Sequence, residues 1–540
     1  MAIANASSAP ILTADGVPLK VSLKRSMRRS KIRALLLILP AFLFLFVVFI
    51  LPIGNLLTRS VDDALVNWQL PITFKLIGDW DRENIPEEEL FRALFVDFTT
   101  VNKFFIQDNT GSSVNISDSA WWVTVPPKGP YREAIIQINP AWGDAVTWQP
   151  LKEIVDRSLE DTGNEKDNKH NQQRATFDLC SELTPLTNAT CSKLFRALQN
   201  WDGNSSPDEP LFAAVYKDLA SAQKILTGKS STRMNYEQPG WKGLIRTSLR
   251  AFKKIEEPPY KEAMIKANKR WGEMPFWESL VLMKDTFTMG YYLNAVDRRF
   301  DVNKKIQLQS EERRVYVMLW WRTLLISCLV TVGCLVLAYP VSHLLATLPL
   351  RYSNLLMICV LMPFWTSLLV RIVSWMVMLQ QQGVINDALV WSHLLSDENR
   401  LPMMYNFTGT VIVMIQILLP FMILPIYSVM KTIPPSYMRA AQNLGAPPSL
   451  AFLRVYMPQT LPGLGAGVIL VFIVAIGYYI TPDLVGGKDG RMIGNMIAYH
   501  MQKSLNWGLG AAMGSVLLGA ILILYWIYDK LVGIDNLKMG

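Results

Sequence analysis

The residues through which this sequence could do chemistry are its histidines and two glycine motifs, and none of them forms a catalytic or metal-binding pattern. The four histidines are scattered, without the spacing of metal ligands or of a nucleophile and its base. Thr227-Gly228-Lys229-Ser230 ends like a phosphate-binding loop, but the glycine needed five positions earlier is Gln223. The glycines from Gly463 to Gly467 open an apolar segment with no strand before them, which favours close helix packing over a dinucleotide site. We therefore expect no enzyme, no metal and no cofactor.

The five cysteines fall into two groups. Cys328, Cys334 and Cys359 lie in apolar segments, where cysteine acts as a small buried apolar residue. Cys180 and Cys191 lie in a polar segment that the topology below places outside the cytoplasm, where oxidising conditions permit a disulfide. Cys180–Cys191 is therefore a candidate bridge.

Arg371 is an ionisable residue inside an otherwise uncharged apolar run. Such a residue lines a pathway or anchors the segment by reaching toward the membrane surface, and both alternatives stay open. Four aromatic residues and one acid complete the set of candidate pathway residues. Packing or anchoring at the membrane surface is the plainer explanation for the aromatic ones. The set is Trp365, Arg371, Trp375, Tyr478, Tyr479 and Asp483.

These residues are carried by long uncharged segments, which indicate a membrane protein. The chain is 51% hydrophobic, with a mean hydropathy of +0.21. An α-helix needs about 20 apolar residues to cross a hydrocarbon core of about 30 Å. Six segments meet this requirement, the third of them continuing past Arg371 to about Gln380. The uncharged windows of these segments are Ala34–Thr58, Thr323–Leu350, Tyr352–Val370, Leu401–Met430, Val455–Pro482 and Ser504–Tyr528. We predict a polytopic α-helical membrane protein.

The distribution of basic residues predicts the orientation. Residues 1–30 form a basic tail that we expect to stay in the cytoplasm, before a first span at 31–58. Six spans return the C-terminus to the cytoplasm. The net charge of +9 then belongs to cytoplasmic loops and is poor evidence for nucleic-acid binding.

Residues 59–314 form an extracytoplasmic insert that is large enough for a core of its own. The run Ala120–Val125 has strand character, whereas Glu153–Leu159 and Leu211–Leu226 have helical patterns, so we predict a mixed α/β domain. Asn164–Arg174 and Asp202–Pro210 are polar runs that predict solvated loops. No repeat of the solenoid type is evident. A five-helix core follows at 315–535.

The segment 434–458 interrupts this core between two apolar spans. Pro434-Pro435 can begin a helix, and Gly445 is placed as the left-handed residue that ends it. Pro447-Pro448 can begin a second short helix, which we expect Pro458 to terminate. A pair of short helices at the cytoplasmic face can fit a groove on a partner protein. An ordinary connecting loop is the alternative.

The same segment resembles the cytoplasmic loop of bacterial ABC importer permeases, whose pattern is E-A-A-x3-G-x9-I-x-L-P. It has Arg in place of the usual Glu at the first position, and identical or similar residues elsewhere. The matching residues are Arg439, Ala440, Ala441, Gly445, Val455, Met457 and Pro458. The resemblance implies the permease fold of type I ABC importers and a coupling helix that docks on a separate ATPase.

A second resemblance narrows the family to permeases of the spermidine/putrescine type. It rests on Pro363–Arg371, Leu337–Pro340, Leu419–Pro425 and Thr481-Pro482, and it covers about 315–535 well. The usual loop after the first span is much shorter than this insert. The family commonly has an acid after the glycine of its fifth span, where this sequence has Gly477-Tyr478; Asp483 follows five residues later.

The resemblance implies a multi-pass permease subunit of the bacterial inner membrane with both termini in the cytoplasm. Its partners would be ABC ATPase subunits that bind the ATP, a second permease, an extracytoplasmic solute-binding protein and membrane lipid. A polyamine is the expected substrate, and an opine, another amino-acid derivative or a metal chelate is the alternative. A membrane-anchored ligand sensor is a different class of function, and a secondary transporter would show internal repeats and no coupling pattern.

Overall fold

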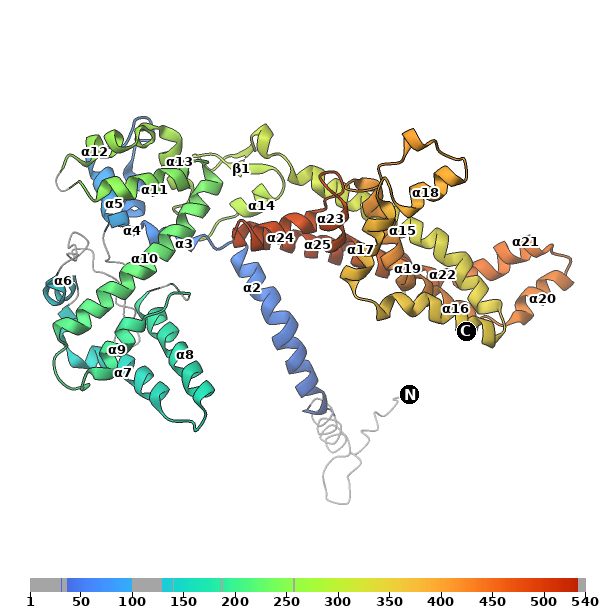
Figure 1. Ribbon diagram of the computed structural model, residues 1–540, viewed down its shortest axis with the longest axis horizontal. Coiled ribbons are helices and arrows are strands. Elements are labelled where there is room, and N and C mark those ends of the chain that lie inside the picture. Colours follow the sequence, from blue (N-terminus) through green and yellow to red (C-terminus); the bar gives the residue numbers. More distant parts are fainter. Residues whose placement is uncertain are drawn as a thin grey trace, which may run out of the picture.

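The apolar segments of the computed structural model form long helices at one end of the molecule, and the insert lies at the other end (Figure 1). The structure describes residues 31, 36–99, 129–138, 140–184, 186, 188–255 and 258–532. Of the regions named above, the basic tail and the run Ala120–Val125 lie outside these residues. Within them, six segments are long and apolar enough to cross a membrane.

The membrane core is built on three helices that pack against one another, α15 (Tyr316–Thr347), α19 (Phe407–Thr432) and α22 (Met457–Ile476). The expected close packing at the glycines of α22 is confirmed. A Cβ atom on Gly463 would lie 2.8 Å from the carbonyl oxygen of Pro425, and one on Gly467 would lie 2.8 Å from the sulfur of Met422. The absence of a side chain at these two glycines lets the backbones of α19 and α22 approach closely.

The remaining spans flank this core. The first lies in the apolar helix Leu36–Arg59, whose C-terminal part is η1 (Phe46–Ile50) and α2 (Leu51–Arg59). It packs on α25 (Trp507–Val532), the last span. Short helices connect the spans outside this core: α18 (Val384–Trp391), η7 (Asp397–Asn399), α23 (Ile480–Val485) and α24 (Ile493–Gln502).

The third span is not one continuous helix. It consists of α16 (Leu350–Leu361), η6 (Met362–Trp365) and α17 (Leu368–Leu379). Thr366 and Ser367 between them are extended, with ψ near 144° and 140°. Pro363, which lacks an N–H, lies in the 3₁₀ turn η6 just before this break, which the uncharged pattern alone did not reveal.

The described part of the insert is helical, with one small hairpin. The prediction of a mixed α/β domain is therefore not supported there: β1 (Arg298–Phe300) and β2 (Ile306–Leu308) form one antiparallel pair, in which Arg298 lies opposite Leu308. The helices are α3 (Ala64–Gln69), α4 (Pro71–Leu76), α5 (Glu88–Thr99), α6 (Tyr131–Ile138), α7 (Ala145–Leu159), α8 (Glu165–Leu183), α9 (Ser192–Asn200), α10 (Glu209–Glu237), α11 (Trp241–Phe252), α12 (Tyr260–Ala267), α13 (Met274–Leu282) and α14 (Gly290–Asn294). Single turns add η2 (Ile77–Asp79), η3 (Pro140–Gly143), η4 (Lys269–Gly272) and η5 (Glu311–Arg313).

The loop predicted at Asn164–Arg174 is wrong, because these residues begin α8. The side chain of Asn164 accepts a hydrogen bond from the backbone N–H of Lys166 and so caps the helix. Farther along α8, Ala175, Leu179 and Leu183 are buried. The polar run is thus the exposed start of a helix whose second half packs inward.

The described part of the insert has two large buried cores. One lies within residues 129–226, here called the central module, and includes Trp142, Trp148 and Phe212. The other joins residues 64–99 to residues 241–283, here called the flanking module, and includes Phe91 and Trp277. A disulfide joins Cys180 to Cys191 in the central module, with Cα atoms 5.1 Å apart.

Candidate functional site

The segment 434–458 projects beyond the ends of α19 and α22 (Figure 1). It contains α20 (Pro435–Asn443), α21 (Pro448–Ala451) and the π-helical turn η8 (Phe452–Tyr456). No residue of α20 is buried. Met438 is partly buried against the membrane core, and most other side chains of α20 are exposed and available to a partner.

The glycine of the Ala-Ala-x3-Gly pattern terminates α20. Gly445 has φ +90°, and its N–H donates to the carbonyl of Gln442 at 2.9 Å. The N–H of Ala446 donates to the carbonyl of Ala441 at 3.1 Å. These two bonds form a Schellman motif, whose left-handed position disfavours any residue with a Cβ. The prediction that Gly445 is the left-handed residue that ends this helix is confirmed.

The exposed face of α20 is apolar along one stripe. Tyr437, Ala440 and Leu444 follow one another at helical spacing and are exposed, and Leu444 is 88% exposed. Arg439 and Arg454 are also exposed, and neither makes an ion pair with any residue that the structure describes. An apolar stripe with free positive charge beside it is chemically suited to a protein surface that carries acids.

The prediction that Pro458 ends the second helix is wrong, since residues 448–476 form one continuous helix. In η8 the N–H of Met457 bonds to the carbonyl of Phe452, five residues back. This wider turn lets the helix pass into Pro458, which has no N–H to donate, at the second residue of α22. Val455 lies in η8 and is half-buried.

Aromatic contacts hold the base of the segment on α15. The ring of His343 packs edge-on against Phe452 and Tyr456, at 5.3 and 5.1 Å between centroids. The hydroxyl of Tyr339 lies 3.2 Å from that of Thr460 in α22. A displacement of the 434–458 segment would therefore be transmitted to α15 and α22.

Of the candidate pathway residues, Arg371 makes the best-defined contacts. The guanidinium of Arg371 donates from Nη2 to the carbonyls of Pro363 and of Thr366, the latter at 3.2 Å. It therefore satisfies backbone groups that the break in the third span leaves open, which favours the anchoring alternative. Tyr478, between α22 and α23, is half-buried and packs against the membrane core.

The other candidates do not converge on one point. Trp365 is 74% exposed, and Trp375 packs at the edge of the membrane core. Tyr479 precedes α23 and is 41% exposed, while Asp483 is exposed on α23. Within the described residues no group of His, Cys, Asp or Glu is placed to hold a metal ion.

Sequence reasoning did not find the joint between the insert and the membrane helices. Its centre is Arg233 in α10, whose Nη2 lies 2.7 Å from the carboxylate of Asp63. Tyr291 donates from its hydroxyl to the same carboxylate at 2.8 Å, and Glu237 pairs with Arg233 at 3.0 Å. Burial raises the pKa of Tyr291 well above its usual range, so its hydroxyl remains a donor. Asp63, Arg233 and Tyr291 are far apart in sequence, so no local pattern indicates this cluster.

A hydrogen-bond chain extends this joint to the segment between the fifth and sixth spans. The hydroxyl of Tyr316, at the start of α15, lies 3.5 Å from that of Tyr236 in α10 and 2.9 Å from Nε2 of His500 in α24. Nδ1 of His500 lies 2.9 Å from the hydroxyl of Ser504. Burial lowers the pKa of His500 to about 4, so the imidazole is neutral at pH 7.

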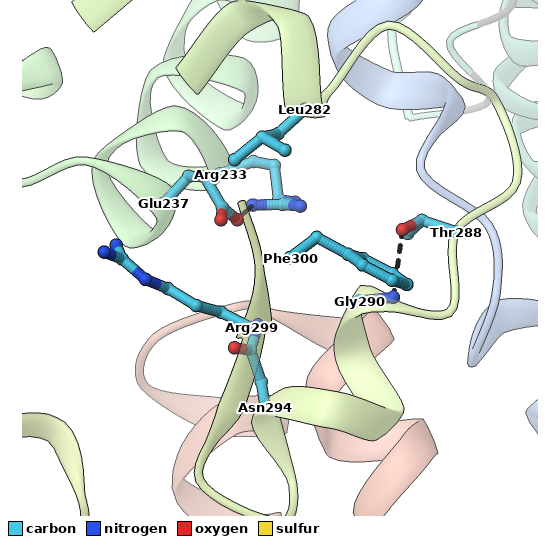
Figure 2. A pocket seen from close by; sticks show the side chains of 8 residues that line it. All are labelled: Arg233, Glu237, Leu282, Thr288, Gly290, Asn294, Arg299 and Phe300. Atoms are coloured by element: carbon cyan, nitrogen blue, oxygen red, sulfur yellow. Dashed lines mark hydrogen bonds and ion pairs between the residues drawn. The ribbon is translucent and has the colours of Figure 1, made fainter. Parts of the chain in front are cut away.

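Figure 2 shows the hollow beside the joint, where α10, α14 and the hairpin meet. Arg233 and Glu237 pair at one side, Phe300 extends toward Gly290, and the guanidinium of Arg299 points away from the hollow. The lining residues hold one another, as Thr288 does by accepting from the N–H of Gly290 at 3.0 Å.

Comparison with known proteins places residues 309–532 in the family described as "Binding-protein-dependent transport system inner membrane component". The spermidine/putrescine transport system permease protein PotB of Escherichia coli (strain K12) is 33% identical over 221 residues, which are 40% of this chain and 80% of that protein. The inner membrane ABC transporter permease protein YdcU of the same organism is 35% identical over 228 residues, covering 39% of this chain and 70% of YdcU.

Solved structures give a weaker match. The crystal structure of a bacterial alginate ABC transporter, in complex with an alginate pentasaccharide-bound periplasmic protein, matches with 16% sequence identity over 43% of this chain and 82% of the other. Its TM-score is 0.35, too low to support an argument. The family match begins at residue 309, close to the C-terminal end of the insert.

Proposed function

The chain belongs to the family of binding-protein-dependent transport system inner membrane components, and on this premise we propose that it forms half of the translocation pathway of a polyamine importer. As a member of this family it is a multi-pass inner-membrane permease of an ABC importer, which works with an ATPase and a solute-binding protein. Spermidine and putrescine are the proposed substrates, because the relative PotB is named for their transport.

The segment 434–458 is the proposed coupling element, and its geometry is the observation that carries the proposal. It projects from the core, ends α20 with a Schellman motif at Gly445 and exposes an apolar stripe. A neighbouring ATPase subunit would bind this stripe and the free Arg439. The ATP would be bound by that subunit, and its closure would move α15 and α22 through the base of the segment.

A second, different permease subunit would complete the pathway, with both termini of this chain in the cytoplasm. The first span supports such an arrangement, because none of the residues in its most apolar window is buried inside this chain. Lipid and a neighbouring subunit would cover that surface. Positive charge in the 434–458 segment, without an acid, agrees with a cytoplasmic position.

Asp483 and the aromatic residues near the outer ends of α17 and α22 are the proposed contacts of the cationic substrate. A polyamine is held by carboxylates and aromatic faces. Asp483 is an exposed acid on α23, and Tyr479 is exposed beside it in sequence. The positive charge of Arg371 is already bound to carbonyls at the break in the third span, so we assign it an anchoring role.

The insert is proposed to grip the solute-binding protein above the pathway. The joint supports this, because it connects α10 of the insert to α15 and α24 beside the outer ends of the spans. Binding of the partner to the insert would thus act on elements that border the pathway.

The proposal is tested by uptake in bacteria that lack their own polyamine importers and express this chain with its partner subunits. Labelled spermidine or putrescine should accumulate in an ATP-dependent manner, and Asp483→Asn should raise KM while leaving the amount of protein in the membrane unchanged. Deletion of residues 65–305 should abolish docking of the binding protein. Uptake of neither polyamine by the intact system would reject the substrate, and normal uptake after the deletion would reject the role of the insert.

A further inference from the structure

Two stretches of the insert correspond residue by residue without a gap. Residues 80–97 read WDRENIPEEELFRALFVD, and residues 201–218 read WDGNSSPDEPLFAAVYKD. The shared positions include the tryptophan and aspartate that open each stretch, the proline, the glutamate, the Leu-Phe pair and the final aspartate. Each stretch ends in a helix, α5 in the first case and α10 in the second.

A second pair of stretches follows the first pair in the same order. Residues 130–151 read PYREAIIQINPAWGDAVTWQPL, and residues 259–280 read PYKEAMIKANKRWGEMPFWESL. Both form a helix, a 3₁₀ turn and a second helix: α6, η3 and α7 in the first, and α12, η4 and α13 in the second. The chain therefore runs through the two kinds of stretch twice in the same order.

The first pair of stretches repeats its local structure as well as its residues. The indole N–H of Trp80 donates to the carbonyl of Asn84 at 2.9 Å, and that of Trp201 donates to the carbonyl of Ser205 at 3.2 Å. Asp97 accepts from the N–H of Thr73 at 2.8 Å, and Asp218 accepts from the N–H groups of Lys193 and Leu194 at 2.8 and 2.7 Å. In both copies, the final aspartate caps the helix that precedes the tryptophan.

The second pair repeats its local structure too. The indole N–H of Trp148 donates to the carbonyl of Trp142 at 2.8 Å, and that of Trp277 donates to the carbonyl of Trp271 at 2.9 Å. Agreement of sequence, order of elements and individual hydrogen bonds is far more than two unrelated helical segments would share.

The contacts between the two kinds of stretch cross from one copy to the other. Glu88, in the first copy, accepts from the N–H groups of Tyr260 and Lys261 in the second, the latter at 2.9 Å. Glu209, in the second copy, accepts from the N–H groups of Tyr131 and Arg132 in the first, at 2.6 and 2.8 Å.

The aromatic contacts cross in the same way. Phe95 packs on Tyr260 and Tyr216 packs on Tyr131, both with 4.8 Å between ring centroids. Phe91 likewise packs on Trp277, and its counterpart Phe212 packs on Trp148.

We propose that the insert is a tandem duplication of one helical module, whose two copies have exchanged halves. The central module combines the second half of the first copy with the first half of the second copy, and so lies on a continuous stretch. The flanking module is assembled from the two outer halves, which are brought together around it.

The duplication separates a repeated part of the insert from a part that attaches it. Asp63, Arg233, Tyr236, Glu237 and Tyr291 all lie outside the two pairs of matching stretches. The attachment to the membrane helices thus consists of segments that have no counterpart in the other copy. The exchange also means that the flanking module cannot form its core until the whole central module has been synthesised.

The exchange is tested by disulfide cross-linking in the full-length protein, with the three free cysteines replaced by alanine and Cys180–Cys191 retained. The pairs Phe95→Cys with Tyr260→Cys, and Tyr131→Cys with Tyr216→Cys, should cross-link within one chain after mild oxidation. The matched control, Phe95→Cys with Tyr131→Cys, joins positions of the same copy and should not cross-link. A control pair that cross-links as efficiently as the other two would overturn the exchange.

The equivalence of the copies is tested by hydrogen exchange in the same full-length protein. Glu209→Gln should raise amide exchange about tenfold in α6 and leave α12 unchanged, because each cap supports one helix start. Glu88→Gln should raise it by a similar factor in α12 and leave α6 unchanged. Increases confined to the helix that follows each glutamate in its own copy, or an effect of only one of the two variants, would contradict the proposal.

Discussion

Arg233 and Asp63 form a buried ion pair between the longest helix of the insert and the residues that follow the first span. Their side chains are 9% and 1% exposed, and Nη2 lies 2.7 Å from Oδ2. Tyr291 adds a hydrogen bond to the same carboxylate and lies under the guanidinium, with 4.9 Å from the guanidinium carbon to the ring centroid. The insert is therefore held by charge as well as by apolar contact.

Removing one partner of this pair should destabilise the protein strongly. In Arg233→Met the buried carboxylate of Asp63 loses its charge partner, which costs about 3–5 kcal/mol. We expect a clear drop in the thermal midpoint of the detergent-solubilised protein. The control Arg174→Met breaks only an exposed pair with Asp178 and should change stability by less than about 1 kcal/mol.

The double variant Arg233→Met with Asp63→Asn should recover part of the loss, because no unpaired charge then remains buried. A double variant less stable than Arg233→Met alone would show that the ion pair is not the source of the effect.

Acidification should destabilise the protein through His500. Its pKa is lowered to about 4 by burial, whereas an exposed histidine titrates near 6.5. Between these values the unfolded state binds more protons than the folded state, so stability falls as pH decreases from 6.5 to 4 and is constant above 6.5. The full effect is about 3 kcal/mol.

The measurement is the thermal midpoint between pH 7.5 and pH 4. His500→Gln keeps a hydrogen-bonding side chain and removes the titration, so its pH dependence in this window should be flatter by that amount. Identical pH profiles for the two proteins would exclude His500 as the titrating group.

A branched residue at position 445 should prevent the delivery of substrate from stimulating ATP hydrolysis. Gly445 has φ +90°, and a Cβ atom added there would meet no atom within 4 Å, so the penalty comes from the backbone conformation and not from crowding in this chain. Gly445→Val should distort the end of α20 and abolish substrate-stimulated ATPase activity while leaving the amount of protein in the membrane unchanged. Gly445→Asn tolerates the left-handed conformation better and should retain most of the activity. Equal activity of the two variants would reject the role of the Schellman motif.

Replacing Arg371 should separate anchoring from contact with the substrate. Arg371→Leu leaves the carbonyls of Pro363 and Thr366 without their donor, which costs about 1–3 kcal/mol. We expect a lower thermal midpoint and a loss of transport in parallel, both partly restored in Arg371→Lys. A change in KM for the polyamine at unchanged thermal stability would instead assign Arg371 to the pathway.

Local patterns were enough for much of this protein. The lengths of the apolar runs predict the spans, because crossing a bilayer imposes a minimum length on a helix. The left-handed end of α20 follows from one glycine at one spacing. The duplication can also be recognised in the sequence, from the Trp-Asp and Leu-Phe positions that both copies share. Its period is far longer than that of a solenoid repeat.

Tertiary structure decided what depends on contacts between distant residues. Pro458 does not end its helix because a π-helical turn precedes it, and the third span breaks at carbonyls that Arg371 satisfies. The sequence shows that Glu88 and Glu209 are equivalent, but not that each caps a helix of the other copy. Capping within one copy and capping between the copies would both fit the same sequence pattern. The choice between them lies in the packing of whole modules, where burial and chain connectivity act together.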